Sequence, residues 1–138
     1  MGLDMWLYRR KHHDEELDVE IGYWRKFNAL HGYIAAMADN YDSCSEIELS
    51  LADLIELRNT CLEIQEKIKQ AQTSSNIEEQ NAIRKEIAVI MPPVTGFFFG
   101  STAIDDDYKL DIDKSIPIFD EAIKLAKQGE QIYYYAWW

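Results

Sequence analysis

The chain contains the stretch Ile132-Tyr133-Tyr134-Tyr135-Ala136-Trp137-Trp138, in which five of seven residues are tyrosine or tryptophan. Aromatic side chains favour β-strands, so this stretch predicts an ordered strand. As a frayed tail it would expose an unusually large apolar surface. The strand that pairs with it is either the one at residues 5–8 or the one at residues 97–99, and the sequence does not decide between them. At an uncovered sheet edge, Tyr133–Trp138 would favour pairing with a second copy, so a homodimer through this aromatic edge is one expectation.

Two more strands are predicted near the N-terminus. Residues 4–9 read DMWLYR and are rich in aromatic side chains. Residues 17–21 read LDVEI and alternate apolar with acidic side chains, which is typical of a half-buried strand. The charged segment 11–16 lies between them. The two strands are therefore placed to pair as a hairpin.

Helices are predicted where apolar residues recur at steps of three and four. The first spans Trp24 to Ala38. After a short strand at residues 46–49, a second begins at Ser50, which forms a capping-box pattern with Asp53. A third starts at the N-cap Asn76 and ends before the two prolines at residues 92–93.

The last third of the chain adds a strand at Phe97–Phe99 and a further helix. The helical stripe runs from Ile112 to Ala126 and contains Pro117. Because proline cannot donate a backbone hydrogen bond, this helix either starts near Ser115 or is kinked. Gly129 is the expected C-cap.

These elements interleave irregularly, which predicts an α+β fold in a single domain over residues 1–138. We expect a small, mainly antiparallel sheet covered on one side by three or four helices. The apolar periodicity assigns these residues to the core: Trp6, Leu51, Leu54, Ile55, Leu62, Ile116, Phe119 and Ile123.

Composition narrows the function classes. The 138 residues carry 14 Lys plus Arg against 25 Asp plus Glu, a net charge of −11, and 47% of them are hydrophobic. That apolar share fits a folded domain, and the negative charge disfavours nucleic acid as a ligand because phosphate binding depends on lysine and arginine. No window is apolar enough to span a membrane, and the N-terminus lacks a signal-peptide pattern. Two cysteines without a CxxC pair are typical of reduced thiols, so we expect a cytoplasmic protein with no membrane partner.

Three pieces of sequence together resemble a family of small, uncharacterised bacteriophage and prophage proteins. They are GLDMWLY over residues 2–8, IGYWRK over residues 21–26 with Asn28 and His31, and GFFFGST over residues 96–102 with Asp106 and Tyr108. The resemblance covers the beginning and the last third of the chain. It implies a phage setting, hence the cytoplasm of a bacterial host cell, and it implies no particular activity.

Carboxylates are concentrated in a few stretches of the chain. Residues 39–56 contain six and no lysine or arginine, and residues 14–20 and 105–113 are also dense in them. If such stretches share a face, their potential would attract a basic protein surface. The candidate partner-binding residues are Asp39, Asp42, Glu46, Glu48, Asp53, Glu56, Asp105, Asp106 and Asp107. The alternative is that these carboxylates only keep the protein soluble.

A second candidate site lies on the first predicted helix. Trp24, Asn28 and His31 fall on one side of it at steps of four and three. Together with the segment Gly96–Thr102, in which Ser101 is the candidate ligand-binding residue, they would line a small-molecule pocket. The alternative is that Trp24 belongs to the core while Asn28 and His31 satisfy backbone groups.

No motif for catalysis, a cofactor or a metal accompanies these patterns. The acidic run at residues 105–113 lacks the glycine and glutamate of a calcium loop, and His12-His13 has no obvious third ligand. We therefore expect no cofactor and no catalytic residue. The leading hypothesis is a non-enzymatic phage-type interaction protein, in its sharpest form an acidic inhibitor of a host protein's nucleic-acid-binding surface. A small-molecule-binding protein or enzyme is the alternative, and an assembly protein is the third.

Overall fold

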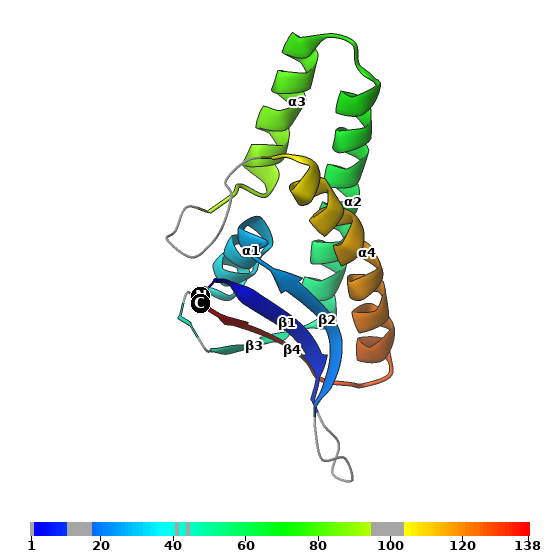
Figure 1. Ribbon diagram of the computed structural model, residues 1–138. Helices are drawn as coiled ribbons and strands as arrows, with labels where there is room; N and C mark the ends of the chain where they lie inside the picture. The colour runs from blue at the N-terminus through cyan, green and yellow to red at the C-terminus, as the bar shows by residue number, and fades with distance from the viewer. Residues whose placement is uncertain (1, 11–17, 41, 44, 95–103) are drawn as a thin grey trace.

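A computed structural model describes residues 2–10, 18–40, 42–43, 45–94 and 104–138 (Figure 1). The elements in chain order are β1 (Asp4–Arg9), β2 (Val19–Arg25), α1 (Asn28–Ala38), β3 (Glu46–Leu49), α2 (Leu51–Thr73), α3 (Ile77–Ile90), α4 (Asp106–Lys127) and β4 (Ile132–Trp137).

The four strands form one antiparallel sheet in the order β2-β1-β4-β3. The predicted hairpin of the first two strands is confirmed, and so is the C-terminal strand, whose neighbour is β1. The expectation of a free aromatic edge is wrong, because β4 pairs on both sides: Ala136 faces Met5 of β1, and Tyr134 faces Ile47 of β3. The edges of the sheet are β2 and β3. The alternative neighbour, Phe97–Phe99, lies outside the described residues.

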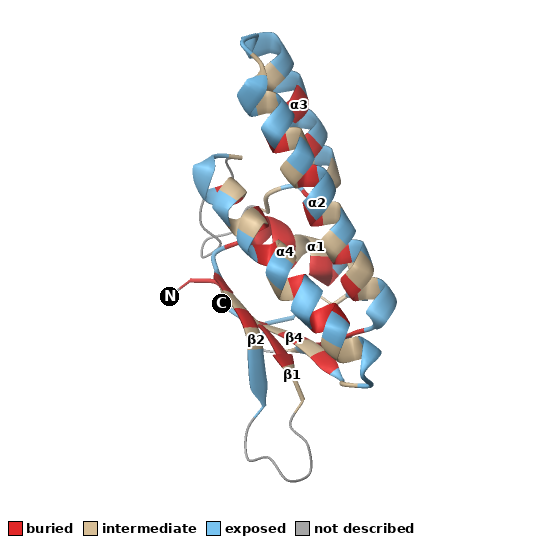
Figure 2. Ribbon diagram, turned by 90° about the vertical axis from the view of Figure 1, so that its right-hand side faces the viewer, coloured by how far each residue is buried: buried red, intermediate tan, exposed pale blue. Residues whose placement is uncertain are grey.

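The described helices cover one face of this sheet, which confirms the α+β class (Figures 1 and 2). The side chains that the sheet turns toward them are buried: Met5, Leu7, Trp24, Ile47, Leu49, Ile132, Tyr134 and Ala136. Helix α2 packs on α4 over the sheet, and its far half pairs with α3 to form a hairpin that projects beyond the sheet (Figure 1). Both predicted N-caps are confirmed: the Ser50 hydroxyl accepts from the Asp53 amide, and the Asn76 side chain accepts from two amides of α3.

One predicted helix start is wrong, and for another helix one of the two alternatives is excluded. Helix α1 begins at Asn28, because β2 continues through Trp24 and Arg25, which pair with Met5 and Asp4. Lys26 then turns the chain with a φ of 57°. Helix α4 begins at Asp106 and carries Pro117 inside it, so a start near Ser115 is incorrect. Its N-cap is Asp105, whose carboxylate accepts from the Tyr108 amide at 3.1 Å.

The core prediction is confirmed for Leu54, Phe119 and Ile123, which are buried. It is wrong for Leu51 and Leu62, which are each 36% exposed. The buried stripe of α2 runs along a neighbouring line of the helix, through Leu54, Leu57, Cys61, Ile64 and Ile68. Ile55 and Ile116 are half-buried at the margin of the core. The prediction is also wrong for Trp6, which is half-buried on the opposite side of β1 from the buried Met5 and Leu7.

Leu54 and Leu62 give a matched pair on one helix. Leu54→Ala empties a site that is 0% exposed and should lower the free energy of unfolding by ~2–5 kcal/mol. Leu62→Ala removes the same atoms from the solvent side and should change it by less than about 1 kcal/mol. Urea unfolding of both variants checks this. Equal losses would mean that α2 is rotated about its axis.

Gly22 permits the close approach of α4 to the sheet. A Cβ added there would lie 2.5 Å from Cγ2 of Ile118 and 2.9 Å from its Cγ1. Gly22→Ala should therefore destabilise the protein by about 1–3 kcal/mol through overpacking. In the double variant with Ile118→Ala the added methyl group has room, so the combined loss should be smaller than the sum of the two single losses. Thermal unfolding of the three variants measures this coupling, and strict additivity would contradict the contact.

Candidate functional site

The face of the sheet turned away from the helices is rich in aromatic and acidic side chains. Alternate residues of a strand point to opposite faces, so the neighbours of the buried residues point outward. In the described part of the chain no helix lies over this face (Figure 2). We call it the open face and define it by Asp4, Trp6, Tyr8, Arg10, Asp18, Glu20, Tyr23, Arg25, Glu46, Glu48, Tyr133, Tyr135 and Trp137.

Two rows of side chains cross the open face. The first row follows the strand order β2-β1-β4-β3 and consists of Tyr23, Trp6, Tyr135 and Glu46, each paired with the next. The ring centroids of Trp6 lie 5.6 Å from Tyr23 and 5.7 Å from Tyr135.

The second row contains Glu20, Tyr8, Tyr133 and Glu48 in the same strand order. Its two tyrosine rings stack with centroids 5.9 Å apart and an interplanar angle of 19°. The middle strands thus carry an aromatic strip, and the edge strands contribute carboxylates beside it.

The open face already holds one guanidinium group. Arg10 donates to Glu46 at 2.6 Å, and its Cζ lies 4.1 Å from the ring centroid of Tyr133 and 6.0 Å from that of Tyr8. Hydrogen bonds from the Tyr8 hydroxyl and from Arg10 lower the pKa of Glu46 below its usual value. This arrangement shows that the aromatic rings and carboxylates of the face can accommodate a guanidinium group.

Carboxylates outnumber cations on the open face. Its carboxylates are Asp4, Asp18, Glu20, Glu46 and Glu48, and its cations are Arg10 and Arg25. Both cations have a carboxylate beside them: Arg10 bonds Glu46, and Arg25 lies 3.8 Å from Asp4. The Tyr23 hydroxyl also donates to Asp4. The negative charge that remains would attract a cationic partner.

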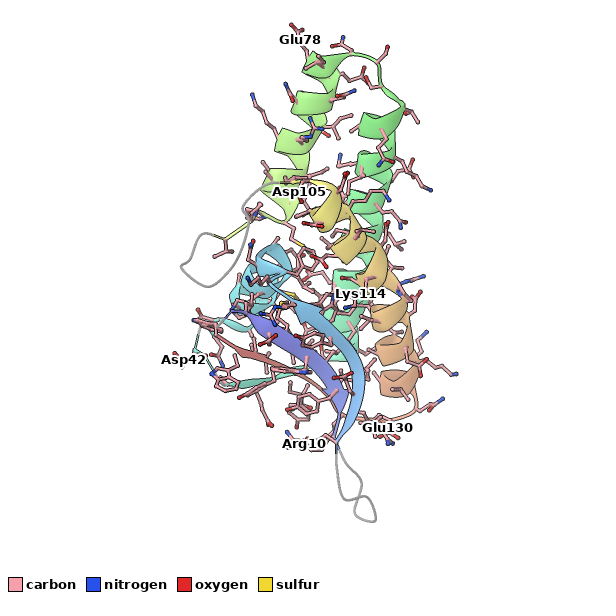
Figure 3. The ribbon with its side chains drawn as sticks, viewed as in Figure 1. Arg10, Asp42, Glu78, Asp105, Lys114 and Glu130 are labelled. Atoms are coloured by element: carbon pink, nitrogen blue, oxygen red, sulfur yellow. The ribbon has the colours of Figure 1, made fainter. Side chains whose placement is uncertain are left out.

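The predicted acidic residues divide among separate places. Glu46 and Glu48 lie on the open face, whereas Asp39 and Asp42 lie at and just beyond the end of α1. Asp53 and Glu56 belong to the start of α2, where Asp53 completes the capping box. Asp105, Asp106 and Asp107 form the N-terminus of α4 beside α3, far along the molecule from Asp42 (Figure 3). The structure therefore does not join all nine into one surface.

The predicted pocket residues Trp24, Asn28 and His31 are buried, and each has a different partner. The Trp24 indole donates to Ser115 Oγ at 2.8 Å, and the Asn28 side-chain oxygen accepts from the Val94 amide at 2.9 Å. His31 Nδ1 lies 2.8 Å from the Tyr134 hydroxyl. These contacts are those of structural polar groups in a core. The fourth predicted residue, Ser101, lies outside the described residues.

His31 nevertheless lines a cavity of about 440 Å³ between α1, the end of α3 and residues 92–94. Its walls are largely apolar and include Tyr33, Ala36, Ile90, Val94 and Trp138. Trp24 and Asn28 do not line it. Burial lowers the pKa of His31 to about 4, so the imidazole is neutral at pH 7. The cavity therefore suits an apolar group rather than a charged one.

Across residues 2–10, 18–40, 42–43, 45–94 and 104–138, no group of three or more His, Cys, Asp or Glu side chains is placed to hold a metal ion. None of the helices described there is long and apolar enough to cross a membrane. His12 and His13 lie outside these ranges.

Sequence reasoning did not assign Trp6, Tyr8, Tyr133 and Tyr135 to one face of the sheet. It placed Trp6 in the core and gave Tyr133–Trp138 the role of a pairing edge. The structure turns Trp6 outward, opposite to Met5 and Leu7, where stacking half-buries it. One signal was present: aromatic residues stand two apart at residues 6 and 8 and at residues 133, 135 and 137, as one side of a strand requires.

The burial of neutral His31 predicts a pH dependence of stability. Its pKa is about 4 in the folded chain against 6.5 in an unfolded one. Between these values the unfolded chain binds a proton that the folded chain does not, so stability falls as pH drops from 6.5 toward 4. His31→Gln should remove this contribution, which has a slope approaching ~1 kcal/mol per pH unit. Urea unfolding of both proteins at about pH 7.5 and about pH 5 tests it. If the parent and the His31→Gln variant lost the same stability between the two pH values, folding would not lower the pKa of His31.

Comparison with known proteins gives no match for this chain. No family model matches it, and no match was found among curated proteins or solved structures. The function is therefore argued from the geometry of the site.

Proposed function

We propose that this chain is a non-enzymatic interaction protein that binds a basic segment of a partner protein on its open face. The observation that carries this proposal is the aromatic strip of β1 and β4 with carboxylates beside it on the edge strands. Trp6, Tyr133 and Tyr135 are half-buried, Tyr8 is only 9% exposed, and Trp137 beside them is 58% exposed. Aromatic surface that is partly open to solvent is typical of protein-binding sites. Its chemistry suits arginine and lysine, because rings attract cations through their faces and carboxylates pair with them.

The same surface is poorly suited to nucleic acids. Aromatic sheet faces can stack bases, but the proteins that use them combine the rings with lysine and arginine that neutralise phosphates. Here the open face carries five carboxylates and two guanidinium groups, in a chain whose net charge is −11. A phosphate backbone would be repelled, whereas a basic protein surface would be drawn in at an increased rate.

The resemblance to phage proteins suggests a setting for this activity. We propose that the partner is a bacterial host protein and that the chain acts in the host cytoplasm. A host surface that binds nucleic acid presents the lysine and arginine residues that the open face would select. The carboxylates would then occupy the place of phosphates, and the interaction would inhibit that host protein.

A second candidate function is supported by the cavity of about 440 Å³ beside His31. Its apolar walls would take an apolar small molecule rather than a basic side chain. The two functions separate in a binding assay, because only peptide binding on the open face depends on surface carboxylates and salt.

A short fluorescent peptide of alternating arginine and serine tests the main proposal. It should bind the full chain at about 50 mM NaCl and release it at about 500 mM. Glu20→Gln together with Glu48→Gln removes two carboxylates from the open face and should weaken binding about tenfold. Fluorescence anisotropy measures both effects.

The matched control removes the same charge elsewhere. Glu63 and Glu66 are exposed on α2, on the helical side of the molecule. Glu63→Gln with Glu66→Gln should leave peptide affinity within about twofold of the parent. Equal weakening by both double variants would mean that net charge alone attracts the peptide, and the open face would lose its assigned role.

A further inference from the structure

A shallow, widely open cavity of about 270 Å³ lies on the open face. Three aromatic rings and two carboxylates line it: Trp6, Tyr8, Tyr135, Asp18 and Glu20. It sits where the two rows of side chains adjoin, on the β2 side of the aromatic strip. Burial and the hydrogen bond to Glu46 are the main causes of the raised pKa of the Tyr8 hydroxyl, and the nearby Asp18 carboxylate adds to them.

A β-bulge gives Glu20 its place in this cavity. Leu7 pairs with Gly22, but the next residue, Tyr8, pairs with Glu20, so Ile21 is an extra residue in β2. Without it, strict alternation would put Glu20 on the same side as Gly22 and Trp24, beneath α4. The bulge lets Ile21 pack against the core and turns Glu20 to the open face.

We infer that this cavity binds the side chain of one arginine from the partner protein, an inference that rests on the proposed function. The guanidinium would lie against the aromatic rings and donate to Glu20 and Asp18. The same kinds of group hold Arg10 nearby on the open face. Its Cζ lies 4.1 Å from the ring centroid of Tyr133, and its guanidinium donates to Glu46 at 2.6 Å. Tyr8 takes part in both the cavity and the Arg10 site, since it lines the cavity and its ring centroid lies 6.0 Å from Cζ of Arg10.

Arginine fits this cavity better than the other cations. Its guanidinium is flat, weakly hydrated and able to donate two parallel hydrogen bonds to a carboxylate, so it can stack and pair at once. A lysine ammonium is strongly hydrated and compact, and it uses a ring face less well. A quaternary ammonium group uses the rings but cannot donate to the carboxylates.

Titration of the full chain with N-acetyl-arginine amide tests the inference. The indole N–H resonance of Trp6 should shift and saturate, and N-acetyl-lysine amide should bind about fivefold more weakly. Glu20→Gln should weaken arginine amide binding about fivefold, because one charged acceptor is lost. Glu63→Gln is the matched control: Glu63 is also exposed, but it lies on α2 and outside the open face, so its loss removes the same charge and should leave the affinity unchanged.

Three results would overturn the inference. They are no saturable shift at Trp6, equal weakening by Glu20→Gln and Glu63→Gln, and tighter binding of tetramethylammonium than of the arginine amide. Failure here can be told apart from failure of the proposed function. If the peptide binds and the arginine amide does not, the open face is a binding surface without an arginine pocket. If the amide binds and the peptide does not, the pocket exists and the proposed function fails.

Discussion

The pairing of β4 with both β1 and β3 unites the sheet. Strand β3 has β4 as its strand neighbour, and the hairpin of β1 and β2 reaches β3 through β4 alone. A two-stranded hairpin is marginal in water without further strands or a packed helix. The residues that complete the sheet are separated from β1 by more than a hundred positions, so the sheet forms through contacts distant in sequence. Helices α1, α2 and α4 can bury their apolar stripes only when that platform exists.

Strand β4 also connects the core to the open face. Ile132, Tyr134 and Ala136 are buried under the helices, and Tyr134 contacts His31 through its hydroxyl. The residues between them, Tyr133 and Tyr135, form half of the aromatic strip. One short strand therefore gives the protein part of its stability and part of the proposed binding surface, and a shift in its register by one residue would exchange the two.

The sequence predicts the elements of this fold better than it predicts their ends. Amphipathic periodicity places the helices, and capping chemistry at Ser50 and Asn76 gives two of their starts correctly. The start of α1 was wrong because the pairing of Trp24 with Met5 is a tertiary contact that extends β2. The start of α4 was left open between Ser115 and an earlier start with a kink at Pro117, because the N-cap at Asp105 was overlooked.

The candidate site was less predictable, for a related reason. Charge along the chain identified Glu46 and Glu48 but grouped them with Asp105, Asp106 and Asp107, which the fold places elsewhere. Tyrosine and tryptophan serve equally well in a core and on an exposed face, so their side of the sheet follows from strand order and register alone. The alternation at residues 17–21 puts Asp18 and Glu20 on one polar side, but a bulge is needed to join that side to the face of Trp6 and Tyr8. The isolated Gly22 next to the bulge was a signal for it that went unused.

The two edges of the sheet limit how the protein associates with others. Strand β3 is only four residues long and turns two glutamates outward, and β2 is distorted by its bulge. Short, charged or bulged edges resist the addition of a further strand, which is the usual route from an open sheet to aggregation. An aromatic surface can then remain uncovered without seeding fibrils. Association is directed to side chains on the face of the sheet, where recognition depends on complementary chemistry rather than on backbone hydrogen bonds that any extended peptide can supply.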